Sequence, residues 1–338
     1  MKIKLNPFFV LVAAVLFFGC PEDDDLTTIP EADRTEQQAE DGPLLIEYLE
    51  THYYNSEELE GISNVSMDDI VVTELDEGES LPTGHTFLIN AVETETVTYK
   101  EAEYKYYILR VNQGGGESFS FADNIRLNYS GNLENGNVFD SSINPVVFDL
   151  TSLVPGWTLI APTFNTASSF ELNGDGTVIY EDAGVGMMFI PSGLGYFSSS
   201  SSGGVTSYSN LIFKFEIFQF EENDHDNDGV PSYLEDIDGN GFVVDEEDNT
   251  DEDNFVDFID ADDDGDGVLT VNEDLEPDTD LEVDEDGDGD PTNDIGDGDP
   301  TNDDTDGDGI PNYLDTDDDG SKLDDEDGDG IPDYIDNN

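Results

Sequence analysis

The sequence predicts an α+β domain, built mainly from an antiparallel sheet, that is followed by an acidic tail with little regular secondary structure. Short runs rich in Val, Ile, Thr and Phe recur between residues 69 and 220, and glycine or proline residues punctuate them, which is typical of strands joined by turns. Of the 84 acidic residues, 50 lie from Glu221 to Asn338, where Lys322 is the only basic residue. The chain therefore divides into a folding part and an acidic part.

Residues 1–20 have the features of a targeting segment. Lys2 and Lys4 precede an apolar run from Phe8 to Phe18, which is too short to cross a bilayer as a helix, and Gly19-Cys20 follows. The segment resembles a bacterial lipoprotein signal, which implies a lipid on Cys20; a plain secretory signal is the alternative. The acidic residues just after Cys20 resemble those of surface-displayed lipoproteins of the Bacteroidetes group. We therefore expect an outer membrane lipoprotein, at the cell surface or on the periplasmic face.

The next elements are predicted in chain order. Residues 21–41 are polar and acidic, as in a tether. Residues 42–99 form an extension: apolar residues from Leu44 to Tyr53 recur at helical spacing, with Pro43 in the first turn, and two strands are expected at 69–75 and 85–91. Residues 100–220 form the main domain, with strands expected at 104–111, 119–129, 146–150, 186–190 and 210–220.

A set of short motifs runs through the main domain. In order they are Tyr129-Ser130-Gly131, Phe139-Asp140-Ser141-Ser142, Val154-Pro155-Gly156-Trp157, Gly195-Tyr196 and Leu211-Ile212-Phe213. This series resembles the FKBP family of peptidyl-prolyl cis-trans isomerases. The resemblance implies a twisted antiparallel sheet around a short helix, and an isomerase that needs no cofactor for catalysis.

The resemblance also implies the residues of an aromatic pocket. Trp157 is its floor, the Val154 N–H holds a substrate carbonyl, the Tyr196 hydroxyl donates a hydrogen bond and Asp140 orients side chains at the rim. The complete set is Tyr129, Phe139, Asp140, Phe148, Leu153, Val154, Trp157, Tyr196, Val205 and Phe213. The alternative is that these are core residues of a β domain.

The sequence departs from the family around this pocket. Phe197 stands where the family commonly has glycine, and a serine run, Ser198 to Ser202, follows it. An insertion that includes Thr163 to Asp182 is absent from compact members of the family. Both changes are expected to narrow, cover or reshape the substrate groove, so a peptide-binding domain with little catalysis remains the alternative to an enzyme.

The acidic tail, residues 221–338, contains six windows that place oxygen-bearing side chains at positions one, three and five, glycine at six and a carboxylate at twelve. This spacing builds the oxygen cage that Ca²⁺ prefers. The predicted ligands are Asp224, Asp226, Asp228 and Glu235; Asp236, Asp238, Asn240 and Glu247; Asp262, Asp264, Asp266 and Glu273; Asp304, Asp306, Asp308 and Asp315; Asp315, Asp317, Asp319 and Glu326; and Asp325, Asp327, Asp329 and Asp336.

These windows lack flanking amphipathic helices and contain Pro231, Pro311 and Pro332, so they are not clearly EF-hands. They resemble thrombospondin type 3 repeats, which implies a tail folded around Ca²⁺. A disordered acidic tail that holds counter-ions diffusely is the alternative.

Composition and charge limit the remaining functions. A net charge of −75 argues against nucleic-acid binding, and the three histidines make no triad or zinc spacing, with His225 expected to face solvent. The expected partners are proline-containing polypeptides, calcium ions and the membrane that holds Cys20. The leading hypothesis is an isomerase of Xaa-Pro bonds in exported proteins; the alternative is a non-catalytic peptide-binding or adhesion lipoprotein with a calcium-stiffened spacer.

Overall fold

The structure is a computed structural model that describes residues 31–174, 176–273, 275, 300–302 and 309–316. Cys20, the signal segment and most residues beyond 275 lie outside this range. The chain divides after Ala32, and every element below belongs to the unit Asp33–Asn338. Among the described residues, no helix has the length and apolar character needed to cross a membrane.

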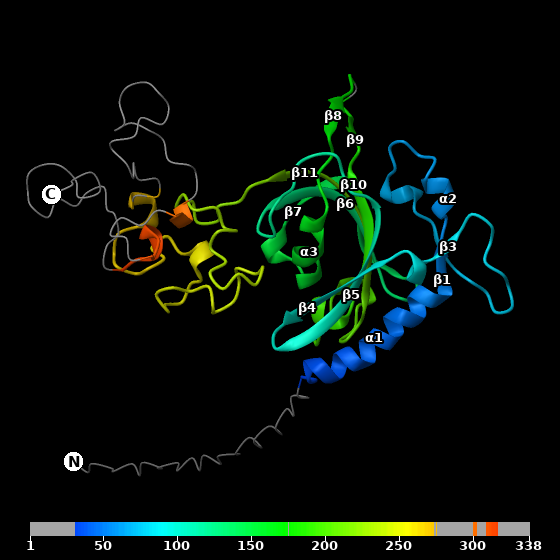
Figure 1. Ribbon diagram of the computed structural model, residues 1–338, viewed down its shortest axis with the longest axis horizontal. Helices are drawn as coiled ribbons and strands as arrows, with labels where there is room; N and C mark the ends of the chain where they lie inside the picture. The colour runs from blue at the N-terminus through cyan, green and yellow to red at the C-terminus, as the bar shows by residue number, and fades with distance from the viewer. Residues whose placement is uncertain (1–30, 175, 274, 276–299, 303–308, 317–338) are drawn as a thin grey trace, which may run out of the picture. The chain divides into compact units, whose positions relative to one another are not determined.

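The described elements comprise three α-helices and eleven strands in an α+β arrangement (Figure 1). The helices are α1 (Arg34–Thr51), α2 (Ser56–Leu59) and α3 (Pro155–Ile160). The strands are β1 (His52–Tyr54), β2 (Val72–Glu74), β3 (Thr86–Phe87), β4 (Glu93–Tyr99), β5 (Ala102–Asn112), β6 (Asn124–Asn132), β7 (Val138–Asp149), β8 (Ser169–Leu172), β9 (Val178–Glu181), β10 (Gly184–Ile190) and β11 (Leu211–Glu221).

Six strands form one antiparallel sheet in the order β4-β5-β10-β11-β6-β7, which curves around α3 (Figure 1). A small sheet, β2-β1-β3, and the hairpin β8-β9 complete the strands. Because β4 pairs with β5 through Tyr99↔Ala102, the expected boundary between residues 99 and 100 cuts a hairpin. That boundary is wrong: β4 belongs to the main sheet.

The central strands are buried on both faces, which explains their nearly continuous apolar sequences. In β10, Met188 and Ile190 point toward α3, whereas Met187 and Phe189 point toward the other face. The first face packs on Trp157, Ile160 and Ala161. The second face packs on α1 through Leu45 and Leu49, which are fully buried.

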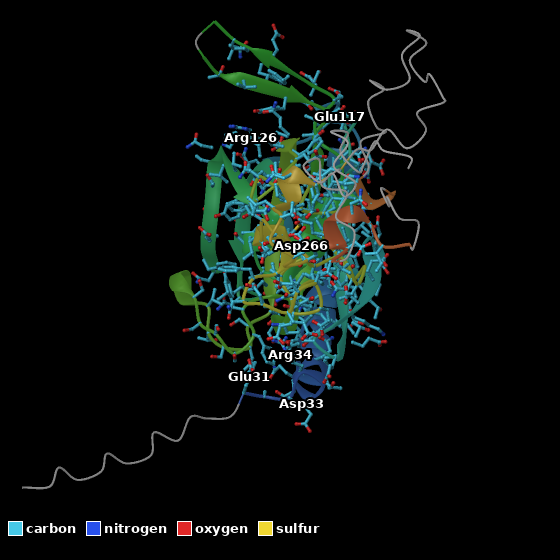
Figure 2. The ribbon with its side chains drawn as sticks, turned by 90° about the vertical axis from the view of Figure 1, so that its left-hand side faces the viewer. Glu31, Asp33, Arg34, Glu117, Arg126 and Asp266 are labelled. Carbon is cyan, nitrogen blue, oxygen red and sulfur yellow. The ribbon has the colours of Figure 1, made fainter. Side chains whose placement is uncertain are left out.

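The first helix begins earlier than the sequence pattern indicates. α1 starts at Arg34, with the side chain of Asp33 accepting a hydrogen bond from the Glu36 N–H at 2.9 Å, so residues 34–41 are helical and do not belong to a tether. Figure 2 shows Asp33 and Arg34 together at this end of the helix. Pro43 lies inside α1 and not in its first turn.

The insertion after α3 folds into the hairpin β8-β9, which extends beyond the six-stranded sheet (Figure 1). Its apolar side chains are largely exposed, with Phe170 at 59% and Leu172 at 67%. Tyr180 anchors its return strand by stacking on Phe218, with ring centroids 4.2 Å apart.

Candidate functional site

An aromatic cluster fills the space between α3 and the concave face of the sheet. Trp157 lies at its centre, 2% exposed, because Pro155 at the first turn of α3 starts a helix that turns this side chain toward the strands. The ring centroid of Trp157 is 6.0 Å from that of Phe148 on β7 and 5.2 Å from that of Phe213 on β11. Tyr129 on β6 meets it edge-on at 6.2 Å.

A second pair of rings extends the cluster along the sheet. Phe139 and Phe213 pack edge-to-face at 5.5 Å, directly over Gly131. A Cβ atom on Gly131 would lie 2.6 Å from Phe139 and 2.8 Å from Phe213. The glycine of the Tyr-x-Gly motif is therefore needed for the close approach of the two rings.

The Tyr129 hydroxyl donates a hydrogen bond of 2.8 Å to the Asp140 carboxylate. Burial, this hydrogen bond and the Asp140 charge all raise the pKa of Tyr129, so its phenol stays protonated. Asp140 thus fixes the orientation of one wall of the cluster.

Four of the sequence-predicted site residues form the solvent-facing part of the cluster. Phe148, Leu153, Val154 and Tyr196 are partly exposed and pack against it, whereas Val205 is buried. Among the described residues, the Tyr196 hydroxyl has no hydrogen-bond partner. The structure therefore brings all ten predicted site residues to one region, in which apolar surface dominates and one phenol remains free to donate.

The loop that carries Tyr196 and Val205 is attached to α1. Asp41 of α1 is 1% exposed, and its Oδ2 accepts hydrogen bonds from the N–H and hydroxyl of Ser192 at 2.9 and 2.6 Å. Asn210, at the other end of the loop, donates to the Asp41 carbonyl at 3.2 Å. The sequence pattern did not indicate this role for α1, although Asp33 followed by Glu36 was a helix-start signal.

Phe197 also faces α1. The Arg34 guanidinium lies 4.1 Å from its ring centroid, and Tyr208 packs on its edge at 5.1 Å. Its φ of 48° is in the left-handed region, which glycine adopts most readily. The departure from the family pattern is thus accommodated by contacts outside the aromatic cluster.

Four groups of carboxylates converge in the described part of the acidic segment, and the atoms of each group lie within 4.8 Å of one another. The groups are Asp226, Asp228, Glu235 and Asp263; Asp236, Asp238 and Asp248; Asp251, Asp253 and Asp260; and Asp262, Asp264 and Asp266. Predicted ligands Asp304, Asp306, Asp308, Asp317, Asp319, Asp325, Glu326, Asp327, Asp329 and Asp336 lie outside the described residues, and Asp315 is buried.

The second and third predicted windows differ from the observed groups in their closing residues, whereas the first group contains the predicted Glu235. In the second window the structure places Asp248, which is fully buried, beside Asp236 and Asp238, whereas the predicted Glu247 is exposed. Asn240 instead donates its side-chain amide to Asp238 at 2.9 Å. Glu273 is buried but lies outside the third group. Residues 246 and 247 lie in a turn, and the carboxylate that joins Asp236 and Asp238 is that of Asp248 and not that of the predicted Glu247.

In the first group, burial and neighbouring negative charges strongly disfavour the ionised form of the carboxylates. Burial, followed by the charge of Asp228, raises the pKa of Glu235 to about 10 and that of Asp263 to about 11. Burial and Asp228 also raise the pKa of Asp226 to about 7. Such a group requires either protons or a cation.

Comparison with known proteins gives matches to relatives, to solved structures and to one family model. The chain is 26% identical to the FKBP-type 22 kDa peptidyl-prolyl cis-trans isomerase of Escherichia coli over 139 residues, covering 40% of this chain and 59% of the relative. It is 26% identical to the FKBP-type isomerase FkpA of Aeromonas hydrophila over 155 residues, covering 45% and 51%. The chain therefore spans between half and three-fifths of the length of these relatives. This chain is homologous to FKBP-type peptidyl-prolyl cis-trans isomerases.

A solved peptidyl-prolyl isomerase of Pseudomonas syringae aligns with 39% of this chain and 82% of its own, at 19% identity and a TM-score of 0.30. One further relative, 25% identical over 115 residues and covering 33% of this chain and 42% of itself, is named outer membrane protein MIP in Legionella longbeachae. Residues 225–280 match a family model described as BamM C-terminal.

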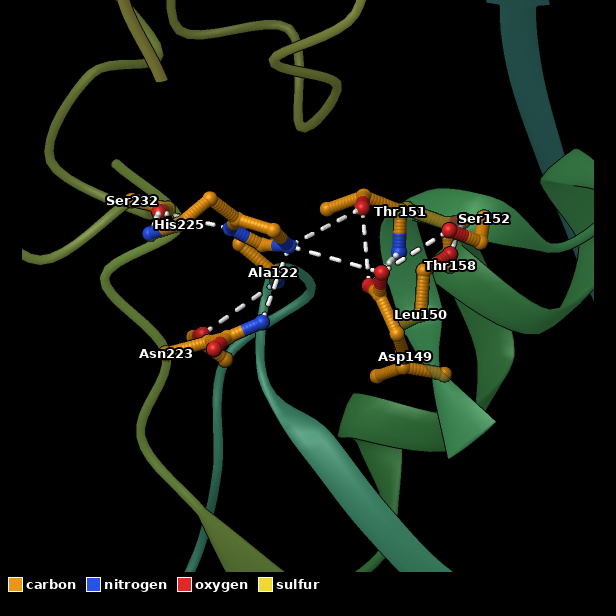
Figure 3. A network of polar contacts seen from close by, with 10 residues as sticks. Ala122, Asp149, Leu150, Thr151, Ser152, Thr158, Asn223, His225 and Ser232 are labelled. Atoms are coloured by element: carbon orange, nitrogen blue, oxygen red, sulfur yellow. Dashed lines mark hydrogen bonds and ion pairs between the residues drawn. The ribbon is translucent and has the colours of Figure 1, made fainter. Parts of the chain in front are cut away.

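His225 links the acidic segment to the domain (Figure 3). Its Nε2 lies 3.4 Å from the Asp149 carboxylate and 2.8 Å from the Asn223 amide, and its Nδ1 lies 2.8 Å from the Ser232 hydroxyl. The ring also packs edge-on against Phe258 at 5.0 Å. The expectation that His225 faces solvent is therefore wrong.

Proposed function

We propose that this protein is an FKBP-type peptidyl-prolyl cis-trans isomerase that acts on Xaa-Pro bonds of exported proteins. The aromatic cluster around Trp157 carries the proposal, because all ten residues implied by the family resemblance converge there. The homology to isomerases supports the same reaction class.

The reaction requires no acid, base or nucleophile. Rotation of an X-Pro bond is opposed by amide resonance, with a barrier of about 18–20 kcal/mol, and the twisted amide is less dipolar than the planar one. An apolar site therefore favours the twisted state relative to water, and only this difference accelerates the rotation.

The position of each residue in the cluster indicates its role in substrate binding. Phe148 and Leu153 are partly exposed and contact the proline residue where the cluster meets solvent, and the buried rings of Trp157 and Phe213 support them from beneath. The free hydroxyl of Tyr196 and the backbone N–H of Val154 provide donors for substrate carbonyls. Asp140 holds Tyr129 in place and does not itself need to touch the peptide.

A proline-peptide isomerisation assay on the full chain tests the proposal. We expect the wild type to accelerate the reaction, Trp157→Ala to lose more than about tenfold in kcat/KM, and Tyr196→Phe, which changes only one hydroxyl, to lose about three- to tenfold. Phe170→Ala is the control, since it removes an exposed aromatic ring from the hairpin. A wild-type rate equal to that of buffer would refute the proposal and, with peptide binding retained, would favour the non-catalytic peptide-binding lipoprotein.

We also propose that a lipid on Cys20 holds the protein at the outer membrane, on the cell surface or the periplasmic face. The name of the Legionella longbeachae relative supports a membrane location. Labelling of wild type and Cys20→Ser with a fatty-acid analogue, followed by fractionation, tests this; equal labelling would contradict it.

We further propose that Ca²⁺ is bound by the acidic segment and has no part in catalysis. The four converging carboxylate groups support this, because each presents several hard oxygen atoms to one point. Small-angle scattering of the full chain with and without chelator tests it, and an unchanged radius of gyration would contradict calcium-dependent folding of the tail.

A further inference from the structure

One carboxylate group combines residues from two distant windows. Asp226, Asp228 and Glu235 come from the first window, and Asp263, which the spacing pattern assigns to no site, joins them. Their ligand atoms lie within 4.8 Å of one another. The ligands of this group therefore come from two separate segments, whereas each predicted window takes all its ligands from one loop.

This group is buried and its oxygens lack donors. Glu235 is 0% exposed and Asp263 1% exposed, and among the described residues neither oxygen of either side chain has a hydrogen-bond partner. The Oδ1 atoms of Asp226 and Asp228 accept from the Asp228 and Val230 N–H groups, but their Oδ2 atoms are buried and without partners. Six oxygens of these four carboxylates are therefore buried without a donor among the described residues, and one oxygen of each carboxylate converges on the same point.

Asp224, which the spacing predicts as the first ligand, lies outside this group. One of its oxygens accepts from the Asn227 N–H at 2.7 Å and the other from the Gly229 N–H at 3.2 Å. Its carboxylate therefore stabilises the turn of the loop.

We infer that Asp226, Asp228, Glu235 and Asp263 form one calcium site that closes across two windows and joins residues 224–235 to the segment around residue 263. Calcium takes six to eight oxygens at about 2.3–2.6 Å, so oxygens on opposite sides of the ion are about 4.6–5.2 Å apart. One oxygen of each of the four carboxylates lies within 4.8 Å of the others, which is close enough for all four to contact one such ion. Magnesium retains several waters and uses few carboxylates, and zinc favours nitrogen and sulfur ligands.

The site has a consequence for the neighbouring domain. Phe258 and Val243 of the acidic segment pack with Ala122, and Phe121 and Tyr233 border this small core. Because Asp263 lies five residues after Phe258 and Glu235 two residues after Tyr233, an ion shared by both carboxylates holds the two segments of this contact together.

This inference rests on the proposed calcium binding of the acidic segment, and not on isomerase activity. The test is calorimetric titration of the calcium-free full chain with CaCl₂, with MgCl₂ as competitor. We expect Asp263→Asn and Glu235→Gln each to lose the same single calcium ion, or to weaken it by more than about tenfold, and the double variant to lose no further ion. Glu247→Gln, in an exposed side chain outside every group, should bind like the wild type.

Two results would overturn the inference while leaving calcium binding intact. Asp263→Asn could keep every ion at wild-type affinity, or the double variant could lose two ions, and either result would mean that the windows close separately. A wild type that binds no calcium would refute both proposals. Fluorescence of Trp157, the only tryptophan, shows whether each variant keeps the folded domain.

Discussion

The attachment of α1 to the loop at residues 192–210 gives a quantitative prediction. Asp41 accepts two hydrogen bonds from Ser192, which is itself 0% exposed, and a third from Gln37 at 2.7 Å. The change Asp41→Ala removes these acceptors and leaves the Ser192 N–H and hydroxyl buried. Asp41→Asn keeps one oxygen for Ser192, and Gln37 can turn its own oxygen toward the new amide group.

The expected loss in the free energy of unfolding follows from the number of hydrogen-bond donors that each substitution leaves unpaired. A buried donor without a partner costs about 1–3 kcal/mol, and the Ser192 hydroxyl can rotate whereas its N–H cannot. We therefore expect Asp41→Ala to lower the free energy of unfolding by about 2–4 kcal/mol, and Asp41→Asn by about 1 kcal/mol, the difference between a charged and a neutral acceptor.

The measurement is urea denaturation at constant calcium concentration, followed by Trp157 fluorescence. Glu40→Ala is the matched control, since Glu40 is the exposed neighbour in the same helix and its replacement should change stability by less than about 0.5 kcal/mol. If Asp41→Ala were as stable as Glu40→Ala, the reasoning would be refuted, because Ser192 would then have found other acceptors.

Two further predictions concern the sheet. Gly131→Ala should lower stability by about 1–3 kcal/mol and reduce isomerase activity, because its Cβ would displace Phe139 and Phe213; unchanged melting and activity would contradict the packing. Burial raises the pKa of Glu216 from 4.5 to about 7, so its ionisation in the folded state costs stability as pH rises from 4.5 to 7, and the cost stays constant above that. Glu216→Gln should therefore stabilise the protein at pH 8, by at most about 3 kcal/mol, and have little effect at pH 4.5; equal melting differences at both pH values would count against this.

The sequence indicated the strands at the centre of the sheet more readily than those at its edge. Strand β10, most of β11 and residues 106–109 of β5 are buried on two faces and therefore have runs of apolar residues. Strand β4 has the sequence Glu-Thr-Glu-Thr-Val-Thr-Tyr and is mostly exposed. Its glutamate residues obscured the strand preference of its Thr and Val residues, so the strand was not predicted. In the structure, β4 forms a strand by pairing with β5 across the turn, and the sequence of β4 alone did not indicate this pairing.

The aromatic site and the acidic groups differ in how far local spacing determines them. Most rings of the aromatic cluster belong to short motifs, so a short sequence sufficed to assign them; these are Tyr129, Phe139, Trp157, Tyr196 and Phe213. The closing carboxylate of a loop depends on which turn follows, and Asp248 rather than Glu247 points inward. Asp263 could not be assigned at all, because its partners are contributed by a segment about thirty residues earlier.

Contacts with a distant segment, and not local spacing, also explain how the loop accommodates Phe197. Phe197 stands where the family commonly has glycine, and this difference suggested an altered pocket rim. In the structure its φ is 48°, which is unfavourable for a large residue. The ring is 5% exposed, however, and its contacts are Arg34 and Tyr208. Arg34 also donates to the Gly193 carbonyl at 3.3 Å, so one side chain of α1 contacts the loop at two points. The substitution at Phe197 and the helix at residues 34–51 therefore form one structural feature: the helix supplies the contacts that compensate for the strained backbone, and the loop in return holds Tyr196 beside the aromatic cluster.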